Sequence, residues 1–99
     1  PSAGITMATS LISLAKNKKI QEGIAMTGEL TLTGRILPVG GIREKLVAAK
    51  RAKVKTVLLP EENRRDIQEI PKYIVEGLQI HFVESYKQVY QICFSDNKH

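Results

Sequence analysis

The apolar and polar positions divide the first part of the chain into a helical and an extended segment. Residues 3–16 are apolar with small polar breaks and carry no charge before Lys16. This pattern predicts a helix that is buried on most sides. Residues 24–39 are rich in β-branched and apolar side chains and are punctuated by Gly28 and Gly34. They predict a β-hairpin that turns back near Gly34.

Beyond the Gly40-Gly41 break, helical and extended segments alternate. The expected elements are a helix at 42–53, a strand at 54–59, a helix at 61–70, a helical turn at 73–76, a strand at 79–84 and a helix at 86–94. In the strand at 79–84, Ile80 and Phe82 share one face and His81 lies on the other. Such an alternation places parallel strands between helices. With the front hairpin, it predicts an α+β (mixed α/β) domain with a small mixed sheet packed against helices.

Composition fits one ordinary globular domain. Of the 99 residues, 42% are hydrophobic and 25% are charged, which excludes disordered and fibrous classes. No stretch approaches the roughly 20 apolar residues of a membrane span, so no membrane partner is expected. Because the chain begins at Pro1 and enters a helical pattern at once, we expect it to be a piece of a longer protein.

The sequence offers little material for metal, disulfide or nucleotide chemistry. Cys93 is the single cysteine and lies in the apolar stripe of the last helix, where core packing is the simpler role. The two histidines, His81 and His99, have no metal-ligand spacing and no serine and aspartate arrangement for a triad. The glycine-rich segment 34–41 lacks the Gly-Lys-Ser/Thr of a phosphate loop. We therefore expect neither a metal nor a cofactor in this chain.

The net charge of +5 is concentrated in the first 60 residues. Residues 1–60 carry ten Lys or Arg and three Glu, whereas residues 61–99 carry five Lys or Arg and seven Asp or Glu. A basic half can attract nucleic acid or acidic polypeptides. The aromatic residues all lie in the other half, although a single-strand-binding surface combines both kinds of side chain. The favoured interpretation of the basic half is a solvated surface. A non-catalytic assembly or nucleic-acid-binding module remains the alternative function.

Lys45 is the charged residue whose position is unusual. At about 100° per residue, it falls in the apolar sector of the helix at 42–53, flanked by Ala48, Ala49 and Ala52. Such a lysine either buries its stem and extends its ammonium to water, or is desolvated and accepts a proton. The second role needs a pKa lowered from about 10.4 to about 7.5, which takes roughly 4 kcal/mol. Geometry alone favours the first role and leaves both open.

Ser2 is the hydroxyl that a neutral lysine could activate. It lies immediately before the first helix, where serine is a favoured N-cap. The free N–H groups and positive dipole end of a helix start also suit a nucleophile and its oxyanion. On physical grounds alone, the cap is the simpler role.

Several segments resemble the signatures of the Lon protease family. Residues 1–4, Pro-Ser-Ala-Gly, resemble the end of the family's nucleophile signature, Pro-Lys-Asp-Gly-Pro-Ser-Ala-Gly. Residues 25–34 resemble its Ala-Met-Thr-Gly-Glu strand and hairpin, and residues 37–45 match its lysine motif with the Gly-Gly break. The similarity continues through 48–52 and 56–63. The spacing of the serine and the lysine is that of the family's catalytic dyad.

The resemblance implies a serine endopeptidase with a Ser-Lys dyad. Ser2 would attack the scissile carbonyl, Lys45 would act as the general base, and Thr27 would hydrogen-bond the lysine and hold it neutral and aimed. Residues 1–99 would form the C-terminal portion of a single Lon proteolytic domain, and the N-terminal strands of that domain are missing from the sequence. The implied activity is hydrolysis of unfolded or damaged proteins in protein quality control.

The resemblance also implies partners outside this chain. ATP and Mg would serve an ATPase module of the parent protein, which is absent from this sequence. The expected partners are unfolded polypeptides, that ATPase module and identical subunits of a homohexamer, and DNA is a further partner that the resemblance allows. A bacterial cytoplasm and a mitochondrial matrix both fit. Another Ser-Lys hydrolase, such as a signal peptidase or a self-cleaving repressor, is less favoured because its lysine lies in different surroundings.

Overall fold

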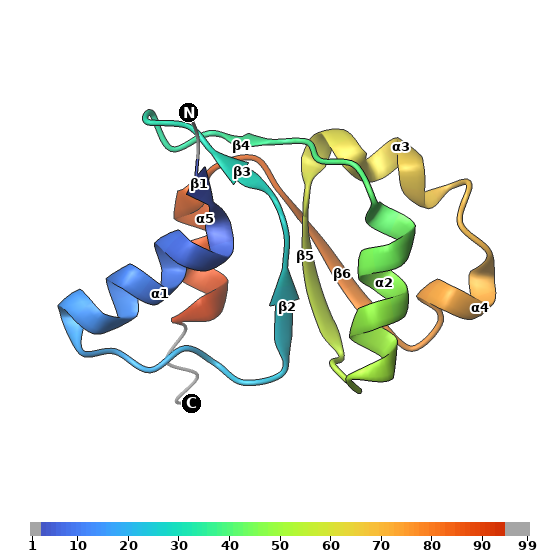
Figure 1. Cartoon of the computed structure of the whole chain (residues 1–99), viewed down its shortest axis with the longest axis horizontal. Coiled ribbons are helices and arrows are strands. Elements are labelled where there is room, and N and C mark those ends of the chain that lie inside the picture. The colour runs from blue at the N-terminus through green and yellow to red at the C-terminus, as the bar shows by residue number, and fades with distance from the viewer. Residues whose placement is uncertain (1–2, 95–99) are drawn as a thin grey trace.

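A computed structural model describes residues 3–94, in which helices pack against two small β-sheets (Figure 1). The parallel sheet has the order β2-β5-β6, formed by β2 (Ile24–Met26), β5 (Thr56–Pro60) and β6 (Gln79–Val83). The antiparallel sheet has the order β1-β3-β4, formed by β1 (Ala3–Gly4), β3 (Glu29–Leu30) and β4 (Ile36–Leu37). The mixed α/β class and the parallel strands of the second half are confirmed, with the strands divided between two sheets.

The helices cover both faces of the parallel sheet. They are α1 (Ile5–Lys16), α2 (Ile42–Arg51), the 3-10 helix η1 (Glu61–Asn63), α3 (Arg64–Ile67), α4 (Lys72–Val75) and α5 (Tyr86–Cys93). Helices α1 and α5 lie on one side of β2 in Figure 1, and α2, α3 and α4 lie on the other. The predicted helix at 61–70 is therefore correct in place and too long, because its first turn is the 3-10 helix η1 and α3 ends at Ile67. The predicted helical turn at 73–76 is present as α4.

Strand β5 is the centre of the fold because both of its faces are buried. Leu58 packs into a core with residues of α1, β4, β6 and α5, whereas Val57 and Leu59 pack into a second core with residues of α2 and α4. The alternation follows from the period of two in a β-strand. The same rule explains β6, where Ile80 and Phe82 pack toward the second core and His81 lies on the other face, as predicted, and is exposed.

The segment 24–39 does not form the single hairpin that its sequence predicts. Its first part, β2, pairs in parallel with β5, and only β3 and β4 form the antiparallel pair. The chain changes sheets at Gly28, where φ is 150° and the carbonyl accepts a hydrogen bond from the Ile5 N–H. A Cβ on Gly28 would lie 2.9 Å from Ile36 Cγ2, so the change of direction needs a glycine. The turn near Gly34 is confirmed.

Helix α1 is less buried than predicted. Ile5 and Thr9 are buried, but Met7, Leu11 and Leu14 are 62%, 61% and 80% exposed. The prediction was wrong because a run of apolar residues does not show how many neighbours a helix has, and α1 packs on its main neighbours, β3 and α5, through one face.

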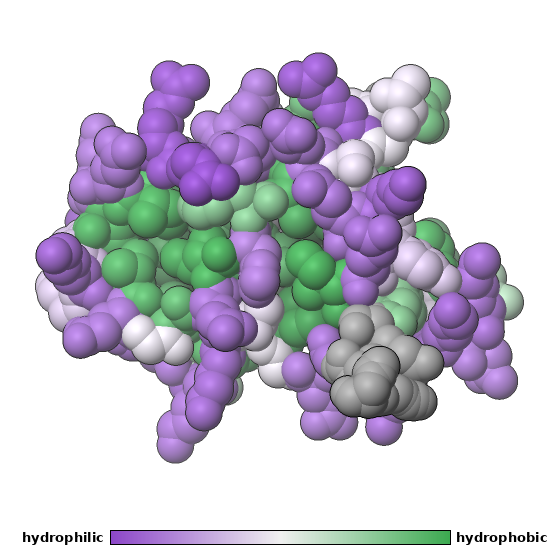
Figure 2. All heavy atoms as spheres, turned by 180° about the vertical axis from the view of Figure 1, so that it is seen from behind, coloured by the Kyte–Doolittle hydropathy of each residue, from purple (hydrophilic) through white to green (hydrophobic). Residues whose placement is uncertain are grey.

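Seen from behind, apolar residues gather over both halves of the molecule between rims of polar ones (Figure 2). Part of the apolar surface is therefore accessible within residues 3–94.

Candidate active site

Helix α2 carries Lys45 in its first turn. The helix follows Gly41, whose φ of 72° is left-handed, and the Lys45 N–H donates a hydrogen bond of 3.1 Å to the Gly41 carbonyl. Ile42, Leu46 and Ala49 bury one face of α2 against the sheet. Lys45 lies beside this buried face, so the packing of α2 fixes the position of the Lys45 main chain.

The side chain of Lys45 is exposed rather than buried among alanines. Ala48 and Ala52, which flank it on the helix, are exposed as well. The apolar sector that the sequence indicates is therefore wider than the buried face. Between residues 3 and 94, neither a hydrogen bond nor an ion pair engages the Lys45 ammonium. Of the two alternatives for Lys45, residues 3–94 show the one in which the side chain reaches solvent.

Lys45 and Thr27 nevertheless line one apolar pocket of about 250 Å³, here named the Lys45 pocket. Its lining residues are Ala25, Met26, Thr27, Lys45, Ala48, Ala49, Ala52, Val54 and Val57. Small side chains on α2 leave this space open beside strand β2. The pocket brings together two of the three residues that the resemblance selects, and gives the lysine amine apolar surroundings on one side.

Thr27 directly follows β2 and is held by the neighbouring strand β5. Its N–H donates a hydrogen bond of 3.2 Å to the carbonyl of Leu58, at the centre of the parallel sheet. No hydrogen bond links Thr27 to Lys45 in the part of the chain that the structure describes. The role of Thr27 in holding the lysine stays a prediction.

Ser2 lies outside the described residues, and the structure describes the backbone from Ala3 onward. Ala3 and Gly4 form β1 and pair with Leu30 and Glu29 of β3. The N–H of Ile5 then donates a hydrogen bond of 3.0 Å to the carbonyl of Gly28. Gly28 is the next residue after Thr27. The start of α1 is thus bonded to the residue that follows Thr27, one of the residues that line the Lys45 pocket.

Asn63 is a residue near this site that sequence reasoning missed. It is buried, and its side chain bonds to both main-chain groups of Val39, in the loop that leads into α2. The sequence places it at the start of a helix, where a surface position is the ordinary expectation. Its partner is 24 residues earlier, so no local pattern reveals the contact.

Cys93 takes no part in this site. It is buried in the core between α1 and α5, as predicted. Burial raises the pKa of the Cys93 thiol to about 11, so the sulfur is protonated and unreactive at neutral pH. Within residues 3–94, no group of three or more His, Cys, Asp or Glu side chains could hold a metal ion.

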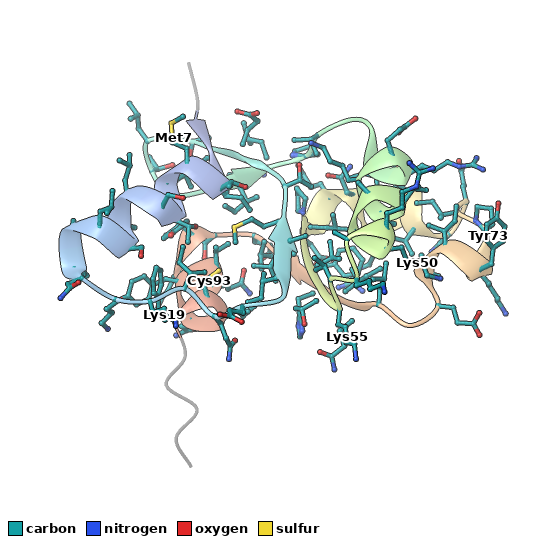
Figure 3. The ribbon with its side chains drawn as sticks, turned by 60° about the horizontal axis from the view of Figure 1, so that its bottom comes forward. Met7, Lys19, Lys50, Lys55, Tyr73 and Cys93 are labelled. Carbon is teal, nitrogen blue, oxygen red and sulfur yellow. The ribbon has the colours of Figure 1, made fainter. Side chains whose placement is uncertain are left out.

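A second surface combines positive charge with an aromatic ring. Lys50 of α2 donates a hydrogen bond to the carbonyl of Tyr73 in α4, and the Tyr73 side chain is 66% exposed. Figure 3 shows both residues at the α2–α4 end, far from Lys19 and Cys93. The basic and aromatic halves of the sequence, separate along the chain, thus meet in space.

Comparison with known proteins decides the family. Residues 1–96 match the family model described as the Lon protease C-terminal proteolytic domain. The chain belongs to the Lon protease family. A Lon protease of Protochlamydia amoebophila is 54% identical over 99 residues, which is the whole of this chain and 12% of that protein. The mitochondrial Lon protease homolog of Homo sapiens is 51% identical over 98 residues, 99% of this chain and 10% of that protein.

The similarity extends across the chain and also to plants. The mitochondrial Lon protease homolog 1 of Arabidopsis thaliana is 52% identical over 98 residues, 99% of this chain and 10% of that protein. The chain spans about a tenth of the length of the curated relatives it matches. Family membership therefore identifies a part of a Lon proteolytic domain. None of the helices between residues 3 and 94 is long and apolar enough to cross a bilayer.

Proposed function

We propose that this chain carries the nucleophile and the general base of an ATP-dependent Lon serine endopeptidase. The observation that carries the proposal is the junction at Thr27 and Gly28. Thr27 lines the Lys45 pocket, and Gly28 accepts the hydrogen bond from Ile5, three residues after Ser2. The hydrogen bond from Ile5 thus ends one residue from the Lys45 pocket, which supports the assignment of Ser2 and Lys45 to one site.

The proposed chemistry divides the reaction between Ser2 and Lys45. With its amine neutral, Lys45 takes the proton from the Ser2 hydroxyl as the oxygen attacks the scissile carbonyl, and later gives it to the leaving amine. This transfer needs a separation of about 3 Å between Oγ and Nζ. The Thr27 hydroxyl hydrogen-bonds the neutral amine, and main-chain N–H groups near Ser2 stabilise the oxyanion.

A neutral lysine requires that water be excluded from its pocket. Within residues 3–94 the Lys45 pocket is open, and the ammonium reaches solvent. We expect the bound substrate, and the strands that precede the serine in the family, to cover it. Desolvation would then disfavour the charged form. Catalytic competence on this account depends on more of the proteolytic domain than this chain contains.

The wider function follows from the family. We propose that the parent protein degrades unfolded or damaged polypeptides, that an ATPase module delivers them using ATP and Mg, and that the proteolytic domains assemble as a homohexamer. The relatives named above include bacterial and mitochondrial proteins. A bacterial cytoplasm and a mitochondrial matrix are the proposed compartments.

Substitution of the dyad in the intact protease tests the proposal. Ser2→Ala and Lys45→Ala should each abolish hydrolysis of a fluorogenic peptide while assembly and ATP hydrolysis persist. Ser10→Ala and Lys55→Ala are matched controls because both side chains are exposed elsewhere on the surface, and they should leave the rate unchanged. Peptidase activity that persists in either dyad variant would contradict the proposal.

A second candidate function, binding of single-stranded nucleic acid, is favoured by one observation. Between α2 and α4 lies a groove of about 330 Å³, lined by Arg43, Val47, Lys50, Arg51, Tyr73 and Ile74. Cationic side chains with an exposed aromatic ring suit phosphates and a stacked base. A Lys50→Gln and Tyr73→Ala double variant should weaken binding of an oligothymidylate, whereas Lys19→Gln, at the far end of the molecule, should not. Equal affinities in the three proteins would exclude this groove.

A further inference from the structure

Asn63 is a buried amide that bonds to the main chain of the loop before α2. Its side chain is 3% exposed. The Val39 N–H donates to Asn63 Oδ1 at 3.0 Å, and Asn63 Nδ2 donates to the Val39 carbonyl at 2.9 Å. The side chain thus completes both main-chain hydrogen bonds of Val39, as a neighbouring strand would.

Asp66 fixes the orientation of this amide. Asn63 Nδ2 donates its second hydrogen to Asp66 Oδ2 at 2.7 Å. The acceptor oxygen must face the Val39 N–H, because a main-chain N–H can only donate. Both hydrogens and the oxygen of the amide are therefore engaged. A rotated amide would lose these bonds, so the contact has one orientation.

Beyond Val39, whose side chain also packs against the second core, the loop that Asn63 holds consists of two exposed glycines. Gly40 and Gly41 follow Val39, and Gly41 adopts a left-handed φ of 72° before α2 begins. A Cβ on Gly40 would meet no heavy atom within 4 Å, and one on Gly41 would meet only the Glu44 side chain at 3.8 Å. Glycines in open surroundings have wide conformational freedom. The anchor for the loop is therefore the residue before them, Val39.

Lys45 lies one helical turn beyond this loop. Its N–H donates to the carbonyl of Gly41, so the first turn of α2 follows the position of the glycines. Ile42, Leu46 and Ala49 hold the helix against the core through apolar contacts, whose attraction is non-directional and opposes small sliding and rotation less specifically. Hydrogen bonds are directional and resist such movement. The amide of Asn63 thus supplies the directional restraint at the lysine end of α2.

We infer that Asn63 is a positioning residue for Lys45, acting through Val39 and the Gly40-Gly41 loop. This inference rests on the proposed function, because it assigns Asn63 a task in catalysis by the dyad. Asn63 does not contact the reacting atoms. Its removal lets the first turn of α2 shift, and a displacement of about 1 Å at a catalytic group can cost roughly 100-fold in rate.

Asn63→Ala in the intact protease is the direct test. The kcat for a fluorogenic peptide should fall roughly 10- to 100-fold, with KM changed less than about twofold, because substrate binding does not use the amide. The acid limb of the kcat/KM profile, which reports the proton on the general base, should move to higher pH. Val89→Ala, in the core on the opposite side of the sheet, is a control for lost stability and should leave kcat and the limb unchanged.

Substitutions of Asp66 provide a second test if Asn63→Ala fails to fold. Asp66→Ala removes the partner that orients the amide, whereas Asp66→Asn keeps an oxygen that can accept its hydrogen bond. The kcat should fall several-fold in Asp66→Ala and stay near wild type in Asp66→Asn. An unchanged kcat and pH profile in Asn63→Ala, or equal kcat values in the two Asp66 variants, would overturn the inference.

The outcome for Asn63 is separable from that for the dyad. If Ser2→Ala and Lys45→Ala abolish activity but Asn63→Ala does not change it, the dyad stands and the positioning role fails. If Ser2→Ala or Lys45→Ala remains active, the proposed function fails, whatever Asn63→Ala shows.

Discussion

The N–H of Ile5 donates a hydrogen bond of 3.0 Å to the carbonyl oxygen of Gly28. This bond joins the first residue of α1 to the residue that follows Thr27. With the pairing of β1 and β3, it fixes the start of α1 against the segment that carries Thr27. The geometry of the proposed active site therefore depends on a close approach between two segments that are distant in sequence.

Substitution of Gly28 should destabilise the fold through this close approach. At this position alanine would have to adopt an unfavourable φ of 150°. Its Cβ would also lie 2.9 Å from Ile36 Cγ2 and 3.4 Å from Pro60 Cγ. We expect Gly28→Ala to lower the free energy of unfolding by about 2–4 kcal/mol, measured with urea. Gly77→Ala is the matched control, since its φ is also positive, at 86°, but its Cβ would meet nothing within 4 Å. Equal losses in both variants would show that packing at Gly28 is unimportant.

The hairpin illustrates what sequence can and cannot predict about this fold. The β-branched run at 24–39 correctly indicates extended chain, and Gly34 correctly indicates the turn. The run does not show that β2 pairs with β5, because the same residue types suit a parallel and an antiparallel neighbour. The parallel pairing of β5 and β6 was predictable from the alternation of helices and strands after Gly41. The change of sheet at Gly28 depends on Ile36 and Pro60, which only the folded chain brings together.

Thr27→Val should reduce peptidase activity without abolishing it. Valine has a similar shape but lacks the hydroxyl that is proposed to hold the neutral lysine. We expect a loss of roughly 3- to 30-fold in kcat, in keeping with one neutral hydrogen bond of about 0.5–1.5 kcal/mol and some misorientation. Steady-state peptide hydrolysis by the intact protease measures it. A loss as large as that of Lys45→Ala would mean that Thr27 has a further role.

The candidate site was also predictable only in part. Helical geometry singled out Lys45, and the motifs connected it with Ser2 and Thr27. Geometry overestimated its burial, because a helical wheel shows which residues share a side but not how far the neighbouring sheet extends. Ala48 and Ala52 face the open Lys45 pocket and are exposed. Asn63 was not predictable, since its role arises from a contact with Val39 that closes a long loop.

The raised pKa of Cys93 predicts a loss of stability in alkaline solution. Burial raises the pKa of this thiol from 9.0 to about 11. Between these values the unfolded chain releases a proton that the folded chain keeps, so the free energy of unfolding falls as pH rises. The slope from this group should be up to about 1.4 kcal/mol per pH unit. Burial also raises the pKa of Tyr86, which adds a slope of the same sign above about pH 10.

Cys93→Ala isolates this contribution. Urea unfolding at several pH values between about 8 and 11 should give a steeper decline for the wild type than for the variant. The absolute stability of the variant is lower at neutral pH because the substitution leaves a cavity, so only the slopes are compared. Parallel slopes would contradict a protonated, buried thiol.

Covalent labelling of the nucleophile tests the central claim most directly. The intact protease is treated with a serine-directed fluorophosphonate, and the modified residue is located by peptide mass spectrometry. The account predicts a label on Ser2 that is lost in Ser2→Ala, forms at least roughly 100-fold more slowly in Lys45→Ala, and is unaffected in Lys55→Ala. A label on another residue, or labelling of Ser2 at the wild-type rate in Lys45→Ala, would contradict the proposed Ser2–Lys45 dyad.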